Sequence, residues 1–195
     1  VIQYVHHPLF AKLKTIIKGN SIGKVLRVKS SFKVPLSDKK NFRFHKNLGG
    51  GALYDVGFYP ISIMFTLFKS KKIKLLKSKI IRQNRLDLMG NVNAQNENNI
   101  IFDLDWGFRS SYKNSLIVYG TKGSLLVDFI FSKNINQDGK IIININRKSE
   151  IIKIPKSNQI NLAFKDMLSN NNKLFYERYQ TSYYTLNIIE KLKKR

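Results

Sequence analysis

Residues 49–60 of this 195-residue sequence read Gly49-Gly50-Gly51-Ala52-Leu53-Tyr54-Asp55-Val56-Gly57-Phe58-Tyr59-Pro60. Three successive glycines let the backbone come close to a ligand or to another chain segment. The apolar spacing that follows predicts a helix over residues 52–68. Proline removes one backbone hydrogen bond from a helix, so we expect Pro60 to bend this helix or to start a new segment.

The pair Asp55 and Tyr59 has two physical interpretations. The two residues are four apart, so on a helix they share one face. A carboxylate and a phenol on one face can position a hydroxyl-bearing substrate and relay a proton. Alternatively, Asp55 complements the positive end of the helix dipole and Tyr59 belongs to the core. The residue types alone favour this second, structural interpretation.

The sequence on either side of this stretch predicts an α+β domain. On the N-terminal side we expect the end of a strand at residues 1–5, a helix from Pro8 to the stop signal at Gly19, and a strand at 24–34, followed by a loop. On the C-terminal side, β-rich segments separated by turn signals predict strands at 73–81, 100–106, 115–119, 124–129, 140–146 and 151–154. Short turns between successive strands favour an antiparallel sheet. A last helix is expected at about residues 174–192.

The composition is strongly basic. Thirty-five Lys and Arg residues against 12 Asp and Glu residues give a formal net charge of +23. Such a balance is typical of proteins that bind nucleic acid or anionic membranes. However, lysine greatly outnumbers arginine, which is the preferred reader of phosphates and bases. Lys, Asn and Ile also share A/T-rich codons, so genome composition alone can explain the charge. We therefore expect no nucleic-acid partner.

Several other classes are excluded by composition. The chain has no cysteine and only three histidines, so disulfides, thiolate metal sites and cysteine nucleophiles are absent. His6 and His7 are adjacent and would point to opposite faces of a strand, so we predict no metal site. No apolar run approaches the length of a membrane span, and no signal peptide is present at the start of the sequence. These features predict a cytoplasmic protein without a membrane partner.

Four segments, in order, resemble those of the Gfo/Idh/MocA oxidoreductase family. The most specific is F-R-F-H-K-N-L-G-G-G-A-L-Y-D-V-G-F-Y-P-I at residues 42–61. The segment Y-V-H-H-P at 4–8 is similar to the aromatic-Arg-x-His-Pro segment that closes the family's nucleotide-binding domain. N-S-I-G-K at 20–24 resembles the G-x-I-G-K turn, and Y-G-T-K-G-S-L at 119–125 resembles the G-T-x-G-x-L hairpin. The resemblance covers nearly the whole chain.

The resemblance implies the C-terminal part of a two-domain enzyme. Members have an N-terminal Rossmann domain, with G-x-G-x-x-G and a later E-K-P segment that carries the catalytic lysine. Their C-terminal α+β domain has a large, mostly antiparallel open sheet, flanked by helices on one face, that usually mediates oligomers. Residues 1–7 would be the last strand of a truncated nucleotide-binding domain, and 8–195 the substrate-binding and oligomerisation domain, with the helix at 174–192 packing back on the missing domain. No G-x-G-x-x-G occurs in this sequence.

The resemblance also assigns site residues. Asp55 matches the family's catalytic aspartate, and Tyr59 matches a position held by histidine or tyrosine that exchanges the substrate hydroxyl proton. A free phenol titrates near pH 10, so a tyrosine base needs a neighbouring cation. Arg43 matches a basic position that can touch cofactor or substrate, and His7 and Pro8 match the pair on the nicotinamide side. The arginine usual in that segment is replaced by Val5, which puts cofactor contacts in doubt.

The expected function is therefore NAD(P)-dependent hydride transfer to or from a sugar, polyol or sugar nucleotide, with NAD or NADP bound mainly by the other domain. We expect a homo-oligomer formed through the sheet face, and no hydride transfer by this chain alone. The alternative is a non-catalytic basic module that forms oligomers through its sheet or binds an anionic polymer, using lysines such as those at 69–79. It predicts steeply salt-dependent binding to DNA or heparin.

Overall fold

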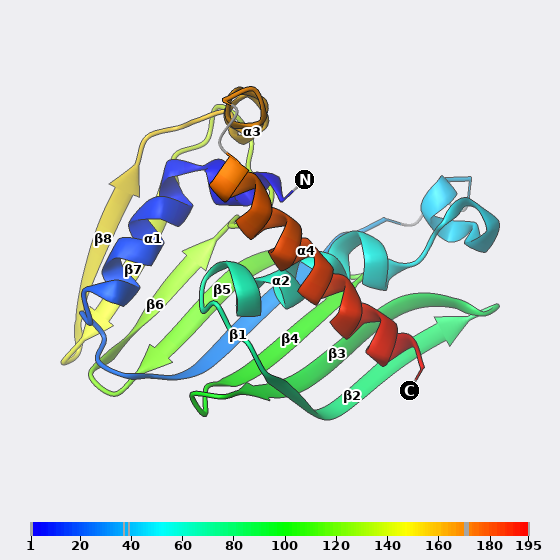
Figure 1. Ribbon diagram of the computed structural model, residues 1–195, viewed down its shortest axis with the longest axis horizontal. Coiled ribbons are helices and arrows are strands. Elements are labelled where there is room, and N and C mark those ends of the chain that lie inside the picture. Colours follow the sequence, from blue (N-terminus) through cyan, green and yellow to red (C-terminus); the bar gives the residue numbers. More distant parts are fainter. Residues whose placement is uncertain (1, 37, 39, 170–171, 195) are drawn as a thin grey trace.

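The computed structural model describes residues 2–36, 38, 40–169 and 172–194, and its centre is one eight-stranded open sheet (Figure 1). The order of the strands is β2-β3-β4-β1-β5-β6-β7-β8. Only β1 and β4 run parallel, and every other neighbouring pair is antiparallel. The strands are β1 Val25–Lys33, β2 Ile73–Gln83, β3 Leu86–Asn96, β4 Ile101–Gly107, β5 Lys113–Gly120, β6 Gly123–Asp128, β7 Gly139–Ile145 and β8 Lys148–Ile154.

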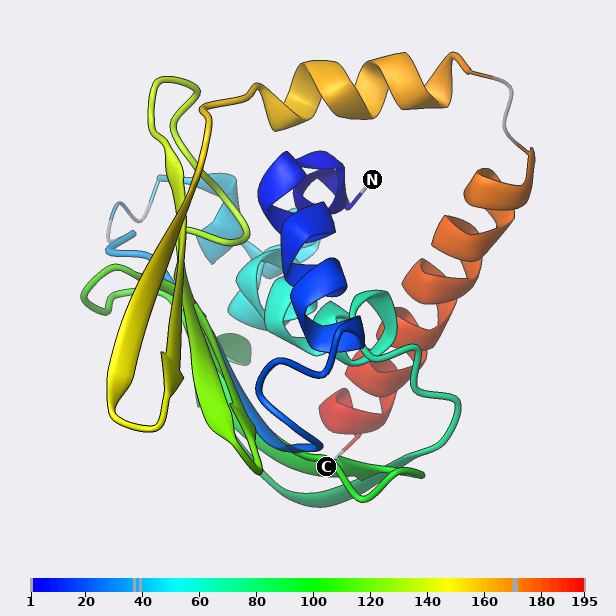
Figure 2. The same ribbon diagram turned by 90° about the vertical axis from the view of Figure 1, so that its left-hand side faces the viewer.

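Helices cover one face of this sheet and leave the other open (Figure 2). They are α1 Pro8–Lys18, α2 Phe58–Thr66, α3 Gln159–Met167 and α4 Asn172–Lys193. Strand β4 shows why the sheet is one-sided: Phe102, Leu104 and Trp106 are buried, whereas Asp103 and Asp105 alternate with them on the open face. The α+β prediction, with a mostly antiparallel open sheet and helices on one face, is confirmed.

Two elements were not predicted. In strand β3 every second side chain is buried along most of its length. The alternate positions carry three amides, at residues 91, 93 and 95, and a segment this polar is not typical of a strand. Its turn from β2 is formed by Asn84 and Arg85, both with positive φ (51° and 62°), and it lacks the usual glycine signal. Helix α3 was also missed. Its cap is Asn158, which accepts from two backbone N–H groups.

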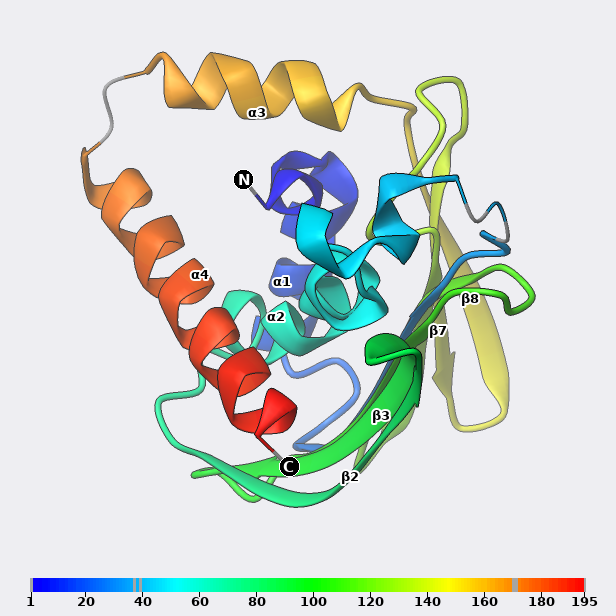
Figure 3. The same ribbon diagram turned by 90° about the vertical axis from the view of Figure 1, so that its right-hand side faces the viewer.

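The strand expected at residues 1–5 does not form over the part of it that the structure describes, and residue 1 lies outside the described residues. Gln3–His6 forms a short 3₁₀ helix, η1. No strand of the described sheet pairs with this segment. Instead, the buried Tyr4 hydroxyl lies 2.7 Å from the Ser62 hydroxyl and 2.9 Å from that of Thr66, both on α2. Side-chain hydrogen bonds to α2 therefore hold this segment in place of the backbone hydrogen bonds that a strand would make to a neighbouring strand. Helices α3 and α4 frame these first residues (Figure 3).

The helix predicted over 52–68 forms in two segments. Leu53–Gly57 is a π-helical turn, η4, and α2 continues from Phe58. Pro60 has no N–H to donate to the carbonyl of Val56 and its ring would clash there, and a wider turn just before it avoids both problems. The new segment therefore starts two residues before Pro60. Among the described residues, no helix is both long and apolar enough to cross a membrane.

Candidate functional site

The glycine run folds back on its own chain. The N–H of Gly51 donates to the carbonyl of Arg43, and the N–H of Gly50 donates to that of His45, both at 3.0 Å. A Cβ on Gly50 would lie 2.5 Å from the Arg43 carbonyl oxygen, and Gly51 has φ +124°. The close approach that the three glycines allow is thus to the segment that carries Arg43. The sequence left this choice open, and the structure decides it in favour of a chain segment.

Asp87 holds the beginning of the π-helical turn. Its carboxylate, on β3, accepts from the backbone N–H of Leu53 at 2.5 Å. A negative group at this end of a helix also complements the helix dipole. Asp55 itself lies in the first turn of η4, as the structural alternative for Asp55 expects, and Asp87 adds a second carboxylate at this end. Asp87 was not foreseen because its strand was not recognised.

Asp55 pairs with Arg43 across the glycine loop. The Arg43 Nε atom lies 2.5 Å from Asp55 Oδ2, and about a third of each side chain is exposed (35% and 33%). Arg43 also lies over the ring of Phe42, at 4.7 Å from the ring centroid. The loop that buries the Arg43 backbone therefore fixes the cation beside the carboxylate. The pair leaves part of both groups open to a ligand.

Tyr59 sits among aromatic rings. Its ring is 5.3 Å from that of Phe32 at 88° and 5.8 Å from that of Phe131, and two further rings lie within 6.3 Å (Tyr4 and Phe58). Its hydroxyl accepts from Gln3 Nε2 at 3.1 Å. Tyr59 is half-buried, so its ring packs against the core while part of the residue is exposed. Among the described residues, no hydrogen bond joins Tyr59 to Asp55, and each has its own partner.

His7 and Pro8 lie at the start of α1. Pro8 is exposed at the first helical position, and His7 Nδ1 accepts from the N–H of Leu9 at 3.0 Å, which caps the helix. His7 is 2% exposed, and its buried Nε2 finds no partner within the described chain. Burial lowers the pKa of His7, and nearby Lys133 lowers it further. Neutral His7 therefore carries its proton on Nε2.

A polar cluster at His6 was not foreseen. His6 Nδ1 lies 3.4 Å from Asp166 Oδ2 on α3, and Arg178 on α4 pairs with the same carboxylate. The His6 side chain is 3% exposed, and burial, with Arg178 nearby, lowers its pKa to about 4. The cluster ties η1 to both C-terminal helices. Nothing in the described part of the chain groups three or more potential metal ligands.

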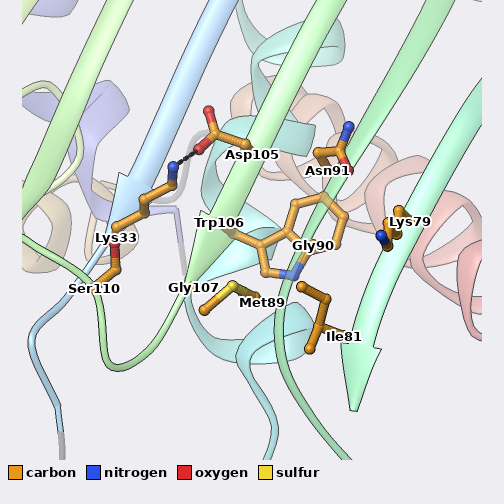
Figure 4. Close-up of a pocket in the computed structure, with 10 residues that line it drawn as sticks. All are labelled: Lys33, Lys79, Ile81, Met89, Gly90, Asn91, Asp105, Trp106, Gly107 and Ser110. Atoms are coloured by element: carbon orange, nitrogen blue, oxygen red, sulfur yellow. Dashed lines mark ion pairs between the residues drawn. The ribbon is translucent and has the colours of Figure 1, made fainter.

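Two cavities lie away from Asp55 and Tyr59. One, of about 580 Å³, lies between α1, α2 and α4 and is lined by basic side chains including Lys14, Lys69 and Arg178. The other, of about 200 Å³, opens on the free face of the sheet beside Gly90 and the Lys33–Asp105 ion pair (Figure 4). Trp106 at its base is fully buried and packs against Gly57 of η4.

Comparisons with known proteins agree on one family. A family model described as GFO/IDH/MocA C-terminal domain matches residues 10–126, more than half of the chain. A dTDP-3,4-didehydro-2,6-dideoxy-alpha-D-glucose 3-reductase from Saccharopolyspora spinosa is 25% identical over 163 residues, covering 82% of this chain and 48% of its own. The enzyme of the same name from Streptomyces antibioticus is 21% identical over 166 residues, covering 84% and 50%. The chain thus spans about half the length of the curated relatives it matches.

Solved structures share the fold. KijD10, a 3-ketoreductase from Actinomadura kijaniata in complex with NADP and TDP-benzene, superposes with a TM-score of 0.91 at 18% identity, over 99% of this chain and 60% of that one. An aldose-aldose oxidoreductase from Caulobacter crescentus, complexed with glycerol, gives a TM-score of 0.80 at 16% identity, over 98% and 60%. At these identities the likeness establishes the architecture alone.

Proposed function

Because this chain belongs to the Gfo/Idh/MocA family, we propose that it is the substrate-side domain of an NAD(P)-dependent oxidoreductase acting on a sugar nucleotide. The proposal is supported by the names of the curated relatives, which are reductases of a dTDP-linked keto sugar. The observation that carries it is the position of Tyr59: its ring packs against the core, its hydroxyl accepts from one donor, Gln3, and the residue is partly exposed.

The cofactor would be NAD or NADP, held mainly by another domain, because this sequence has no G-x-G-x-x-G to bind a pyrophosphate. The residues present fit a minor share in binding it. His7 Nε2–H has no acceptor among the described residues, and because this atom is buried it would have to be uncovered to meet the cofactor. Pro8 shapes the same turn, and Arg43 offers a partly exposed cation. The nicotinamide, when bound, supplies or accepts the hydride.

Tyr59 would move the proton in this reaction. In the reductive direction, its hydroxyl gives a proton to the carbonyl oxygen as the carbonyl carbon gains hydride, which leaves a phenolate and a new alcohol. Asp55, fixed by Arg43, would accept a hydrogen bond from a neighbouring sugar hydroxyl and orient the ring to be reduced. In the oxidative direction, the phenolate would take the proton back.

Two further parts of the proposal concern assembly. We assign residues 1–7 to the junction with a nucleotide-binding domain, against which α4 would pack. The open face of the sheet, which no helix covers (Figure 2), would form a homo-oligomer. Sedimentation of the purified chain tests the second point, with a monomer at micromolar concentration as the outcome against it.

The test of Tyr59 is kinetic. The experiment uses a fusion protein, called the assembled enzyme, in which the nucleotide-binding domain of the S. spinosa reductase precedes Val1. In this enzyme Tyr59→Phe should lower kcat about 10²-fold, the usual effect of losing an acid–base group. Tyr119→Phe, on the open face of β5, is the matched control and should leave kcat unchanged. Equal kcat in wild type and Tyr59→Phe would remove Tyr59 from the chemistry.

A further inference from the structure

The hydroxyl of Tyr59 has one protein partner within the described chain, the side-chain amide of Gln3. The Gln3 Nε2 atom donates to the phenol oxygen at 3.1 Å. A phenol oxygen carries one hydrogen and accepts through its lone pairs, whereas an amide nitrogen only donates. Because Gln3 occupies an acceptor position, the hydrogen of Tyr59 points elsewhere and is left for another oxygen.

The short helix that carries Gln3 is fixed on two sides. Tyr4, the next residue, is completely buried and bonds to Ser62 and Thr66 on the same helix as Tyr59. His6, one 3₁₀ turn after Gln3, contacts Asp166 on α3. Gln3 itself is half-buried. Its amide therefore reaches Tyr59 from a backbone that is already held in place, so little side-chain freedom remains to be lost.

The ring of Tyr59 is fixed separately. Phe32 on β1 meets it edge-on at 5.3 Å, and Phe131 lies 5.8 Å away on the loop after β6. Asn114 holds that loop, since it accepts from the N–H of Phe131 at 3.0 Å and donates to the Ser132 carbonyl at 2.8 Å. Aromatic packing thus sets the plane of the phenol, and Gln3 sets the direction of its O–H.

We propose that Gln3 is a positioning residue that orients the Tyr59 hydroxyl toward substrate and stabilises the phenolate left after proton transfer. The proposal rests on the function proposed above. When Tyr59 gives up its proton, the contact from Gln3 becomes a charge-assisted hydrogen bond, which is shorter and about twice as strong as a neutral one. The amide thus interacts more strongly with the product of proton transfer than with the ground state, which is the condition for catalysis. Tyr4, whose ring lies 6.3 Å from that of Tyr59, stays neutral because burial raises its pKa.

The contact can be tested in the 195-residue chain without any activity. Tyr59→Phe removes the phenol oxygen and should shift the side-chain amide resonance of Gln3 in a ¹⁵N-glutamine-labelled sample. The amide of Gln95, which bonds to Asn99 at the end of β3, should keep its chemical shift. An unshifted Gln3 signal would contradict the contact itself.

The role is tested in the assembled enzyme with two replacements. Gln3→Leu removes the donor and should lower kcat about tenfold or more, the worth of a hydrogen bond to a charged group, while KM changes little. The alkaline limb of the kcat profile should move to higher pH, because the phenolate has lost a donor. Gln3→Glu places an acceptor, charged at pH 7, against the forming phenolate and should be slower than Gln3→Leu. Gln83→Leu, which loses a hydrogen bond to Arg109 at the exposed end of β2, is the matched control.

The outcomes separate the two proposals. If Tyr59→Phe leaves kcat unchanged, the proposed proton relay fails and Gln3 has nothing to position. If Tyr59→Phe is slow but Gln3→Leu is as fast as wild type, the relay stands and the role of Gln3 is wrong. If Gln3→Glu is faster than Gln3→Leu, Gln3 accepts from Tyr59 instead of donating to it, which also overturns the proposal.

Discussion

At the scale of single residues, Asp55 and Tyr59 are held independently of each other. Their spacing predicts one helix face, whereas the structure places Asp55 in η4 and Tyr59 in α2, with different partners, Arg43 and Gln3. Arg43 was a candidate because it stands in the recognised segment before the glycines. Gln3 and Asp87 carried no local signal, because a hydrogen bond between residues 56 apart, or 34 apart, leaves no periodic trace in a sequence.

Asp55→Asn separates a functional from a structural role. The Arg43–Asp55 pair is partly exposed, and pairs of this kind contribute about 0–1 kcal/mol. We therefore expect a change in unfolding free energy of about 1 kcal/mol or less, together with a fall in kcat of about tenfold or more in the assembled enzyme. Asp138→Asn, at an exposed carboxylate that accepts from the backbone N–H of Lys156, is the control for activity. Lower stability with unchanged kcat would support the structural interpretation of Asp55.

His6 gives the fold a dependence on pH. Its pKa is lowered to about 4 in the folded chain, chiefly by burial, from an ordinary value near 6.5. Between these values the unfolded chain binds the proton more readily, so stability rises with pH in this window. Stability is therefore undiminished by His6 above pH 6.5 and falls as the pH drops from 6.5 through 4. The largest loss in unfolding free energy from this one group is about 3 kcal/mol.

Urea unfolding at pH 7 and pH 4.5 measures this effect. His6→Gln should reduce the difference in unfolding free energy between the two pH values. His45→Gln, at an exposed position, is the control and should keep the difference of the wild type. The same difference in wild type and His6→Gln would show that another group is responsible.

At the scale of elements, the glycine loop and the π-helical turn build the site. Gly49 has φ +77° with open space where a Cβ would be, whereas Gly51 has φ +124° and a Cβ there would collide with Asp87. We therefore expect Gly49→Ala to cost about 1 kcal/mol, the ordinary penalty of the left-handed region. Gly51→Ala should cost clearly more, about 2–3 kcal/mol, because it adds a clash to a region that only glycine favours.

Chemical denaturation of the two glycine variants checks the comparison. Gly51→Ala should also weaken the bond from Leu53 to Asp87, and so slow the assembled enzyme through Asp55. Equal stabilities of the two variants would mean that the loop yields easily and does not fix the turn.

Most helices and strands could be predicted from the periodicity of their apolar residues. The helix from Pro8 ends at Lys18, just before Gly19, and β1, β4, β5 and β7 lie within one or two residues of their expected bounds. The first residues were misjudged because their apolar, β-branched pattern suits a strand, whereas the contacts that decide their structure come from Ser62 and Thr66, far along the chain. The parallel pairing of β1 with β4 is likewise a long-range property.

At the scale of the whole molecule, the candidate proton-relay residue Tyr59 depends on contacts from several parts of the fold. The sheet orders β1 between β4 and β5, so residues 25–33 bring Phe32 under Tyr59. Phe131, in the loop after β6, completes the aromatic cluster, with its ring 5.8 Å from that of Tyr59 and 5.6 Å from that of Phe32. The candidate site is therefore a product of the complete fold, and the recognised segment at residues 42–61 contributes only part of it.

The most direct test of the proposed function follows deuterium. The assembled enzyme and the 195-residue chain are each incubated with NADPH that carries deuterium at both C4 positions and with a dTDP-linked keto sugar, and the mass of the sugar product is measured by mass spectrometry. We expect one deuterium in the alcohol formed by the assembled enzyme, a strongly reduced yield with Tyr59→Phe, and none with the chain alone. A correctly folded assembled enzyme that transfers no deuterium to any keto sugar nucleotide, or a Tyr59→Phe variant with full yield and rate, would contradict the account.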